Sequence, residues 1–442
     1  MRSTAVLAAL SSAFLAVGCA STASPPAAPA DSLREMNSVA ESYVHLVLAV
    51  GQHDKDYVDA FYGPPEWKTE AERGRRPLAD LASEAARLIA RMEALPEPSD
   101  PLLRLRRDYL TRQLQSVSAR VAILGGKKLT FDEESRALYD AVAPVNSEEH
   151  FREVRDELDR TLPGKGGPAT LLDRYEAFRK EFTIPKDKVD AVFRAAIGEC
   201  RDRTTRHLSL PPDESFTVEY VTGKSWSGYN WYQGHFRSLI QVNTDLPTTI
   251  DRAIDLACHE GYPGHHVYNM LLEKSLVRDR GWIEYTVYPL FSPQSLIAEG
   301  SANFGIEVAF PGDERVTYEK STLYPLAGLD PARAEEFDRV RHITDRLAYA
   351  GNEAARRYLN GEIDAAAAAR WLADYALASK ERAEQRVRFF DQYRSYVINY
   401  NLGKDLVRKY VEAHGGTPDH PEKRWEIFGE LLSSPRLPSQ LK

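Results

Sequence analysis

The chain has 442 residues, of which 43% are hydrophobic and 28% are charged. This composition is typical of a globular protein that buries at least one large core, so we expect disorder only near the ends. The formal net charge is −8, and basic residues alternate with acidic ones, as in residues 333–346 (RAEEFDRVRHITDR). A nucleic-acid-binding protein gathers its basic residues on one surface, so the sequence argues against that class.

Residues 1–18 have the pattern of an export signal, because one arginine is followed by an apolar run that is short for a membrane span and then by small residues. The segment ends in LAVGC and resembles a bacterial lipoprotein signal, which predicts that Cys19 is lipidated. The alternative is a plain signal peptide in which Cys19 is incidental. Ala20 replaces the aspartate that commonly retains lipoproteins at the inner membrane. We therefore expect an anchor in the outer membrane, facing the periplasm or the cell surface.

Residues 19–34 include STASPPAAPADS, which has few large apolar residues and several prolines. This segment predicts a flexible tether. From residue 35 to residue 442 we expect a single, mostly helical domain, because no later segment resembles a linker.

Helical spacing of apolar residues recurs along the first half of the chain, and it predicts helices over residues 33–50, 78–95, 101–124, 147–162, 169–182 and 186–208. Residues 216–244 are rich in aromatic and β-branched residues with glycine between them, which indicates a small sheet. A helix over residues 250–260 follows, and the helical pattern returns from residue 293, most clearly over 361–390. The predicted fold is mainly α, with a small β-sheet before the helix that carries the candidate site.

Cys200 and Cys258 are the two cysteines beyond the signal, and no framework of closely spaced cysteines exists. A scaffold held together by several disulfides is therefore excluded. We expect both residues to be buried thiols.

The stretch CHEGYPGHH, residues 258–266, is the strongest candidate for chemistry. A helix with two histidines four positions apart can bring both imidazoles to a zinc ion, while the glutamate after the first histidine acts as general base. This sequence breaks that spacing, because Pro263 stands four positions after His259 and the next histidines are His265 and His266. On an undistorted helix, His265 would lie about 120° away from His259 around the axis.

Two interpretations of the broken spacing remain open. Proline interrupts a helix, and Gly261 and Gly264 tolerate unusual backbone angles, so a looped-out turn could bring a later histidine back beside His259. The alternative is a helix that ends at Glu260, followed by a Pro-Gly turn and two partly exposed histidines.

HEGYPGHHVYN and the later LIAEGSANFGIE together resemble the bacterial family called domain of unknown function 885, which belongs with the thermolysin-like zinc peptidases. The order of parts matches over about two-fifths of the chain. The resemblance implies a zincin-like catalytic core and a metal site within residues 259–307. In it, His259, His265 and Glu299 bind zinc, and Glu260 is the general base that activates the zinc-bound water.

The resemblance also suggests roles for two neighbouring residues. His266 either contacts the ligands or the substrate, or it replaces His265 as the ligand. Glu307 either holds a ligand histidine through a hydrogen bond or is an exposed helical carboxylate.

Two further features bear on the substrate. Residues 237–244 (RSLIQVNT) resemble the edge strand along which such peptidases bind an extended peptide, which places Gln241 and Asn243 beside the substrate. The alternative is an ordinary sheet strand. Tyr400 matches a late Y-x-x-G element of the family, and its phenol could donate to the developing oxyanion, with core packing as the alternative.

The chain departs from the family pattern at three places. Ser301 stands where tryptophan is usual, and residues 394–396 lack the expected Pro-Gly-Gln stretch. The histidine expected after residues 341–345 (RHITD) is absent, and Tyr349 is the nearest residue that could replace it. These departures leave the ligands intact but affect the pocket, so substrate preference cannot be inherited from the family.

The sequence thus predicts an exported, lipid-anchored zinc metallopeptidase that acts on peptides in the cell envelope. It predicts no nucleic-acid partner and no membrane contact other than the lipid anchor. Two alternatives stay open, a catalytically inactive envelope lipoprotein that binds peptides or a partner protein, and a zinc hydrolase of non-peptide amides.

Overall fold

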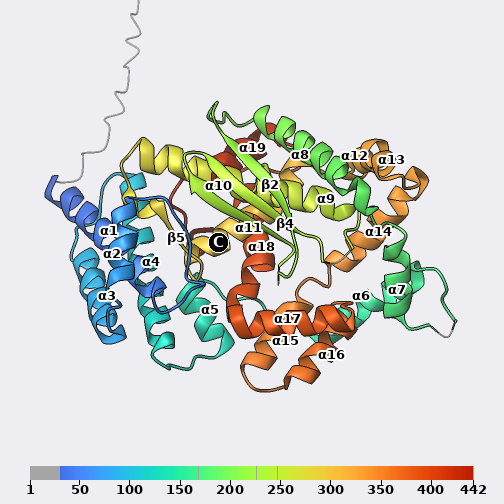
Figure 1. The fold of residues 1–442 in the computed structure, drawn as a ribbon, viewed down its shortest axis with the longest axis horizontal. Coiled ribbons are helices and arrows are strands. Elements are labelled where there is room, and N and C mark those ends of the chain that lie inside the picture. Colours follow the sequence, from blue (N-terminus) through green and yellow to red (C-terminus); the bar gives the residue numbers. More distant parts are fainter. Residues whose placement is uncertain (1–29, 168, 225, 246, 442) are drawn as a thin grey trace, which may run out of the picture.

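The computed structural model describes residues 30–167, 169–224, 226–245 and 247–441 (Figure 1). Cys19, the predicted signal over residues 1–18 and most of the predicted tether lie outside the described residues. Residues 30–34, which we assigned to the end of the tether, instead begin the first helix, α1 (Ala30–Gly51). Asp31 in the first turn of α1 favours this start, because an acidic side chain there interacts well with the helix dipole.

Helices make up most of the described chain. In chain order they are α1 (Ala30–Gly51), α2 (Pro65–Arg73), α3 (Leu78–Glu93), α4 (Pro101–Leu124), α5 (Phe131–Tyr139), α6 (Glu148–Thr161), α7 (Leu171–Lys180), α8 (Val189–Thr205), α9 (Asp251–Leu256), α10 (His265–Leu272), α11 (Pro293–Ala309), α12 (Glu314–Tyr318), α13 (Tyr324–Ala327), α14 (Ala334–Asp345), α15 (Ala350–Leu359), α16 (Ala365–Tyr375), α17 (Lys380–Tyr393), α18 (Ile398–Ala413) and α19 (Pro421–Leu432). The strands are β1 (Val58–Phe61), β2 (Ser215–Val221), β3 (Gly228–Gly234), β4 (Arg237–Asn243) and β5 (Val287–Pro289). The predicted mainly helical fold, with a small sheet before the helix of the candidate site, is confirmed.

The described strands form a three-stranded sheet in the order β2-β4-β3 and a two-stranded ribbon of β1 and β5. In the larger sheet, β4 pairs in parallel with β2 and antiparallel with β3. The prediction that residues 237–244 form an edge strand is therefore wrong, because the backbone of β4 is hydrogen-bonded on both sides. The side chain of Gln241 donates to Glu219 on β2, and that of Asn243 donates to the carbonyls of Lys224 and Trp226.

Two large hydrophobic cores and a small third one, beside β4, fill the described interior, and α11 and α18 contribute to both large cores. On α11, Leu296 belongs to the core built mainly by the N-terminal helices, while Phe304 belongs to the core beneath the sheet. On α18, Leu402 and Val407 divide in the same way. Figure 1 shows α1 to α4 at one end of the molecule and α12 to α14 toward the other, with α11 and α18 between them. The two shared helices therefore join the two ends.

The helices α11 and α18 approach each other closely through two glycines. A Cβ atom on Gly300 would lie 2.3 Å from the carbonyl carbon of Gly403, and one on Gly403 would lie 2.6 Å from the carbonyl oxygen of Leu296. Only a residue without a side chain fits at either position. This contact fixes α11, and with it Glu299, against the helix that carries Tyr400.

None of the helices in the described ranges is both long enough and apolar enough to cross a membrane.

A disulfide joins Cys200 on α8 to Cys258, directly before His259. The expectation of two buried thiols is therefore wrong. The residues are 58 apart in the sequence, but α8 packs along the turn that contains Cys258 and brings their Cα atoms within 5.7 Å. The bond ties the start of the candidate site to α8.

Replacing both cysteines by serine should lower the free energy of unfolding by about 4 kcal/mol, because the bond closes a loop of 58 residues in the unfolded chain. The measurement is chemical unfolding followed by circular dichroism, with and without reductant. Reductant should shift the midpoint of the wild type and leave that of the double variant unchanged. Equal midpoints for the double variant and the oxidised wild type would contradict this stabilising role.

Candidate metal centre

The helix that carries the histidines is interrupted between His259 and His265. The last turn of α9 continues as a π-helical turn, Ala257–Gly261, and α10 begins anew at His265. Across the break, the amide of Gly264 donates to the carbonyl of Cys258 at 2.9 Å. Of the two interpretations of the sequence, the structure shows the looped-out turn.

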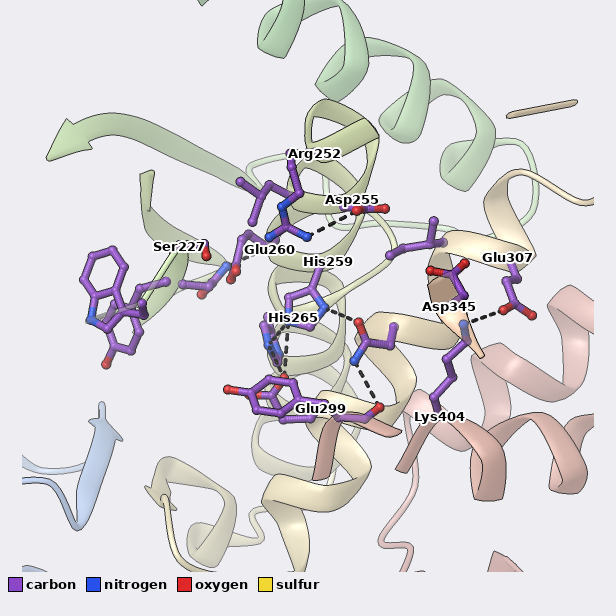
Figure 2. A pocket seen from close by; sticks show the side chains of 18 of the residues that line it. Ser227, Arg252, Asp255, His259, Glu260, His265, Glu299, Glu307, Asp345 and Lys404 are labelled. Carbon is purple, nitrogen blue, oxygen red and sulfur yellow. Dashed lines mark hydrogen bonds and ion pairs between the residues drawn. The ribbon is translucent and has the colours of Figure 1, made fainter. Parts of the chain in front are cut away.

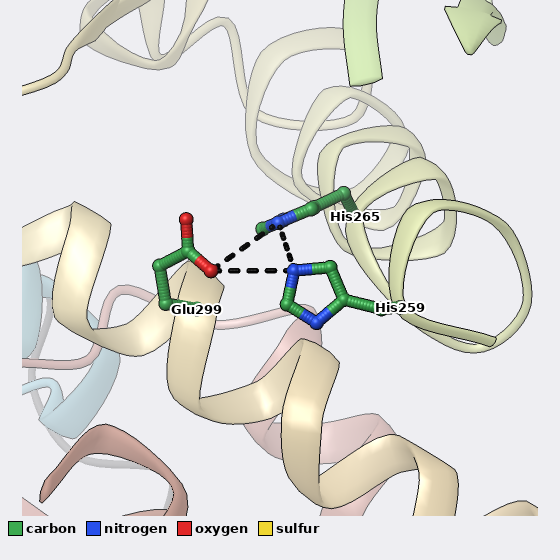
Figure 3. Close-up of side chains that lie close together, drawn as sticks. All are labelled: His259, His265 and Glu299. Atoms are coloured by element: carbon green, nitrogen blue, oxygen red, sulfur yellow. Dashed lines mark hydrogen bonds and ion pairs between the residues drawn. The ribbon is translucent and has the colours of Figure 1, made fainter. Parts of the chain in front are cut away.

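This turn places three side chains around one point (Figure 3). The Nε2 atoms of His259 and His265 are 3.1 Å apart. The Oε2 atom of Glu299, which projects from α11, lies 3.3 Å from Nε2 of His259 and 3.7 Å from Nε2 of His265. Two segments of the chain that are about 40 residues apart thus contribute to one cluster.

Hydrogen bonds from outside the cluster hold His259 and Glu299 in position. Nδ1 of His259 lies 3.1 Å from Oδ1 of Asn303, and the Asn303 amide nitrogen donates to the carbonyl of Tyr400 at 3.2 Å. The bond to Tyr400 fixes the orientation of the Asn303 amide, so that its oxygen faces His259. The Nδ1–H of His259 therefore donates to this oxygen, and the lone pair on Nε2 of His259 faces the cluster. The phenol of Tyr396 donates to Oε1 of Glu299 at 2.7 Å.

Whether a metal ion fits here depends on the atoms that these hydrogen bonds leave facing the centre of the cluster. Oε2 of Glu299 is buried and accepts no hydrogen bond among the described residues. Two imidazole nitrogens and this carboxylate oxygen point toward the same place, and they are the atoms that typically bind zinc while leaving a coordination position open. A buried carboxylate oxygen without a donor is costly unless a cation satisfies it. His259, His265 and Glu299 could therefore hold a zinc ion.

Burial changes the acidity of the carboxyl groups around the cluster. Burial favours the neutral form of Glu299, but the two imidazoles, where they carry a proton, outweigh this effect and hold the pKa of Glu299 well below its usual range. Burial raises the pKa of Glu260 to about 7, and the nearby charge of Glu299 adds to this effect. Burial also raises the pKa of Asp59 on β1 to about 6, although the phenol of Tyr229 donates to it.

These groups line a cavity of about 1030 Å³. Glu260, Asp59 and Tyr400 all lie in its wall, together with residues 227–230 at the start of β3. The strand comes so close to Glu260 that a Cβ atom on Gly228 would lie 2.7 Å from its Oε1. Among the described strands β3 pairs only with β4, so the edge strand beside the cluster is β3.

His266 is directed away from the cluster and into the protein. Its Nδ1 lies 2.8 Å from the hydroxyl of Ser238, and its Nε2 lies 3.1 Å from Oε2 of Glu214. The same oxygen of Glu214 accepts from the phenol of Tyr262 at 2.5 Å. The alternative in which His266 replaces His265 in the cluster is wrong, because its ring is fully buried between the sheet and the turn. Glu214 instead ties both ends of the turn to the sheet.

Glu307 also has a different role from the predicted hydrogen bond to a histidine. Its carboxylate forms ion pairs with Lys404 at 2.7 Å and Arg408 at 2.6 Å, as Figure 2 shows for Lys404. It lies two helical turns after Glu299, and α18 supplies the two cations that bind it there. Asn303, one turn after Glu299, makes the contact to His259 instead.

The three positions that depart from the family pattern differ in their relation to the cluster. Ser301 is buried and donates to the carbonyl of Ala298. Tyr349 donates to Asp405 at 2.6 Å. Only the segment over residues 394–396 reaches the cluster, through Tyr396.

Sequence reasoning missed Asn303, Tyr396, Tyr229 and Asp59. The spacing of four between Glu299 and Asn303 was a usable signal, because residues at that spacing share one helix face. No local pattern indicates Asp59, which reaches the cavity from a strand about 200 residues before the histidines.

The chain matches no family model and no curated protein. Among solved structures it is similar to a candidate lipoprotein from Colwellia psychrerythraea, with 13% identity, a TM-score of 0.50, and coverage of 94% of this chain and 75% of the other. A candidate lipoprotein of unknown function from Shewanella oneidensis is also similar, with 13% identity, a TM-score of 0.42, and coverage of 83% and 75%. The TM-score of the second structure is too low to support an argument. At 13% identity, the first structure shows only a shared fold.

These comparisons overturn the assignment to the domain of unknown function 885 family. No family model matches, the description of the solved structure with the shared fold gives no family or activity, and the sequence has no H-E-x-x-H motif. The assignment was based on two short motifs. Motifs of this length describe how a turn and a helix place a few side chains, and unrelated sequences can share them.

Replacing Gly264 by alanine should distort the turn, because the new Cβ would lie 1.9 Å from the carbonyl oxygen of His259. We expect a destabilisation of about 2 kcal/mol or more, in the range of other strained backbone substitutions. Thermal unfolding by calorimetry measures the change. Gly198→Ala is the matched control, because Gly198 lies within α8 with nothing near its Cβ position, and alanine there should stabilise slightly. Equal stability of the two variants would disprove the steric argument.

Replacing Glu214 by glutamine should destabilise the protein in a pH-dependent way. Burial favours the neutral acid, but hydrogen bonds from His266, Tyr262 and Arg201 lower the pKa of Glu214 to about 2. Since this pKa lies below the usual 4.5, the charged form stabilises the fold above pH 4.5 by about 3 kcal/mol, and this contribution is lost as the pH falls toward 2.

Unfolding midpoints of the wild type and Glu214→Gln, measured from pH 7 down to pH 2, should therefore converge at the acid end. Glu219→Gln on the exposed face of β2 is the control, with no expected difference. A gap that is constant with pH would contradict the role of the Glu214 charge.

Proposed function

We propose that this protein is a zinc-dependent hydrolase of peptide bonds in the cell envelope. The observation that carries the proposal is the convergence of His259, His265 and Glu299, whose three ligand atoms lie within 4.8 Å of one another. Bound at these atoms, zinc would act as a Lewis acid and lower the pKa of a water molecule. The predicted zincin-like catalytic core is part of this proposal and depends on the same cluster.

Glu260 has the properties of a general base that accepts a proton from the attacking water. It is 4% exposed, follows the ligand His259 directly and lies in the cavity wall. Burial raises its pKa, as suits a group that accepts a proton and later returns it near neutral pH. In this role, Glu260 takes the proton from the attacking water and passes it to the leaving amine.

Two other parts of the cavity wall suit an extended peptide. The edge of β3 that pairs with no described strand could bind the main chain of a substrate, the role that the sequence assigned to the neighbouring strand β4. The ring of Tyr400 packs against Tyr396 with a centroid distance of 5.8 Å. From there, its phenol is available to donate to the developing oxyanion.

Three observations support a location in the envelope. The predicted lipidation signal precedes Cys19, and the solved structure with the same fold is described as a candidate lipoprotein. The disulfide between Cys200 and Cys258 is typical of proteins that fold in an oxidising compartment. We therefore propose a lipid-anchored protein of the envelope, with the outer membrane as the location that Ala20 favours.

The test is metal analysis combined with digestion of a peptide library. Purified wild-type protein should contain zinc at a ratio of about one to one and lose peptide hydrolysis on addition of a chelator. His265→Ala should lose the zinc, while His150→Ala, at an exposed histidine on α6, should retain it. Glu260→Gln should keep the zinc and hydrolyse peptides at least about a hundredfold more slowly, because its proton transfer is lost.

Absence of zinc, or unchanged hydrolysis in Glu260→Gln, would refute the proposal. Zinc without any hydrolysis of the library would favour one of the two alternatives from the sequence, a peptide-binding lipoprotein or a hydrolase of other amides.

A further inference from the structure

A second cavity, of about 400 Å³, adjoins the cavity that contains the cluster of His259, His265 and Glu299. The two share part of their walls, including Arg252, Leu256 and Arg386. Leu256 lies one helical turn before Glu260, so the second cavity opens beside the same helix that carries the cluster. Figure 2 shows Arg252 next to Glu260 in the shared region.

The charge of the second cavity differs from that of the first. Four arginines line it, and no aspartate or glutamate does among the described residues; the arginines are Arg179, Arg252, Arg382 and Arg386. The cavity around the metal cluster, by contrast, has many carboxylates in its wall. A concave surface with charge of one sign concentrates ligands of the opposite sign.

Among the residues that the structure describes, three of these four arginines form no ion pair. Arg252 forms an ion pair with Asp255 at 3.2 Å, and Asp255 also binds Arg315 at 2.9 Å. Arg179 donates to the neutral hydroxyl of Thr249. For Arg382 and Arg386, the described residues provide no ion pair.

Arg386 lines both cavities and packs against aromatic rings. Its guanidinium carbon lies 4.6 Å from the ring centroid of Phe389 and 5.9 Å from that of Tyr400. Aromatic faces hold a guanidinium group in place without neutralising it, so its hydrogen-bond donors remain available.

Burial also makes this charge costly. It lowers the pKa of Arg386, and burial together with the charges of Arg179 and Arg252 lowers the pKa of Arg382. An anion in the cavity would oppose both effects, because its negative charge would stabilise the charged form of the two arginines.

We propose that the second cavity binds a carboxylate of the peptide substrate, and that Arg386 and Arg382 are its specificity-determining residues. This proposal depends on the proposed function for the identity of the substrate. The guanidinium fork matches a carboxylate with two parallel hydrogen bonds, and a peptide can supply such a group from an acidic side chain or from its C-terminus. A substrate bound in both cavities would have its carboxylate on one side of Glu260 and its scissile bond at the cluster.

The test measures binding by calorimetry on zinc-free full-length protein, so it does not require metal or hydrolysis. The probes are three short N-acetylated alanine peptides. One has a free C-terminal carboxylate, one has an amidated C-terminus, and one is amidated but contains a single glutamate. At least one carboxylate-bearing peptide should bind about ten- to a hundredfold more tightly than the neutral amide, as expected for hydrogen bonds to a charged group.

Arg386→Gln should reduce the ratio of the affinity for the carboxylate-bearing peptide to that for the neutral amide about tenfold. The double variant Arg382→Gln/Arg386→Gln should bind the two peptides equally. Arg388→Gln is the matched control, because Arg388 lies two residues further along α17, is exposed and lines neither cavity. It should bind like the wild type. Thermal unfolding of each variant separates a loss of binding from a loss of folding.

A preference for the free C-terminus or for the glutamate peptide identifies the source of the carboxylate, and either one supports the proposal. Equal binding of all three peptides, no measurable binding of any, or an advantage that persists in the double variant would overturn it. A failure to find zinc or hydrolysis would refute the proposed function and leave this binding result unaffected.

Discussion

The candidate site depends on one break in helical hydrogen bonding, between Cys258 and Gly264. On a continuous helix, His265 would point away from His259 by about 120°. The π-helical turn and the following non-helical residues bring its ring back to within 3.1 Å of that histidine. The break is stabilised by the bond from the Gly264 amide to the carbonyl of Cys258, and a side chain at Gly264 would collide with the backbone.

The surroundings of this break hold it from several sides. The disulfide attaches Cys258 to α8, Asn230 on β3 donates to the carbonyl of Glu260, and Glu214 binds the side chains on both sides of the turn. An irregular backbone keeps a single geometry only where such contacts over-determine it. Three different elements thus fix the direction of two imidazoles.

Glu299 reaches the cluster through a different constraint, the close contact of α11 with α18. These helices belong to both hydrophobic cores, so packing at either end of the molecule influences where Glu299 lies. The same contact brings Tyr396 and Tyr400 beside the carboxylate and orients Asn303 toward His259. The cavity therefore lies where the two cores meet, and the arginine-lined cavity extends it between the sheet and α17.

The sequence by itself determined the mainly helical fold, the small sheet before the site and the histidine-rich turn, whereas Glu299 was named only through the resemblance to a family. Apolar spacing is local, and the unusual run around His259, Pro263 and His265 lies within a few residues. The tertiary structure alone decided the order of the strands, the disulfide, the position of His266 and the partners of Glu307. Each of these depends on which distant segments pack together. β4 became the central strand because β2 added to it in parallel, and Cys200 met Cys258 because α8 lies along the turn. Asp59 and Arg386 joined the cavities for the same reason, since their elements are far from the histidines in the chain and close to them in the fold.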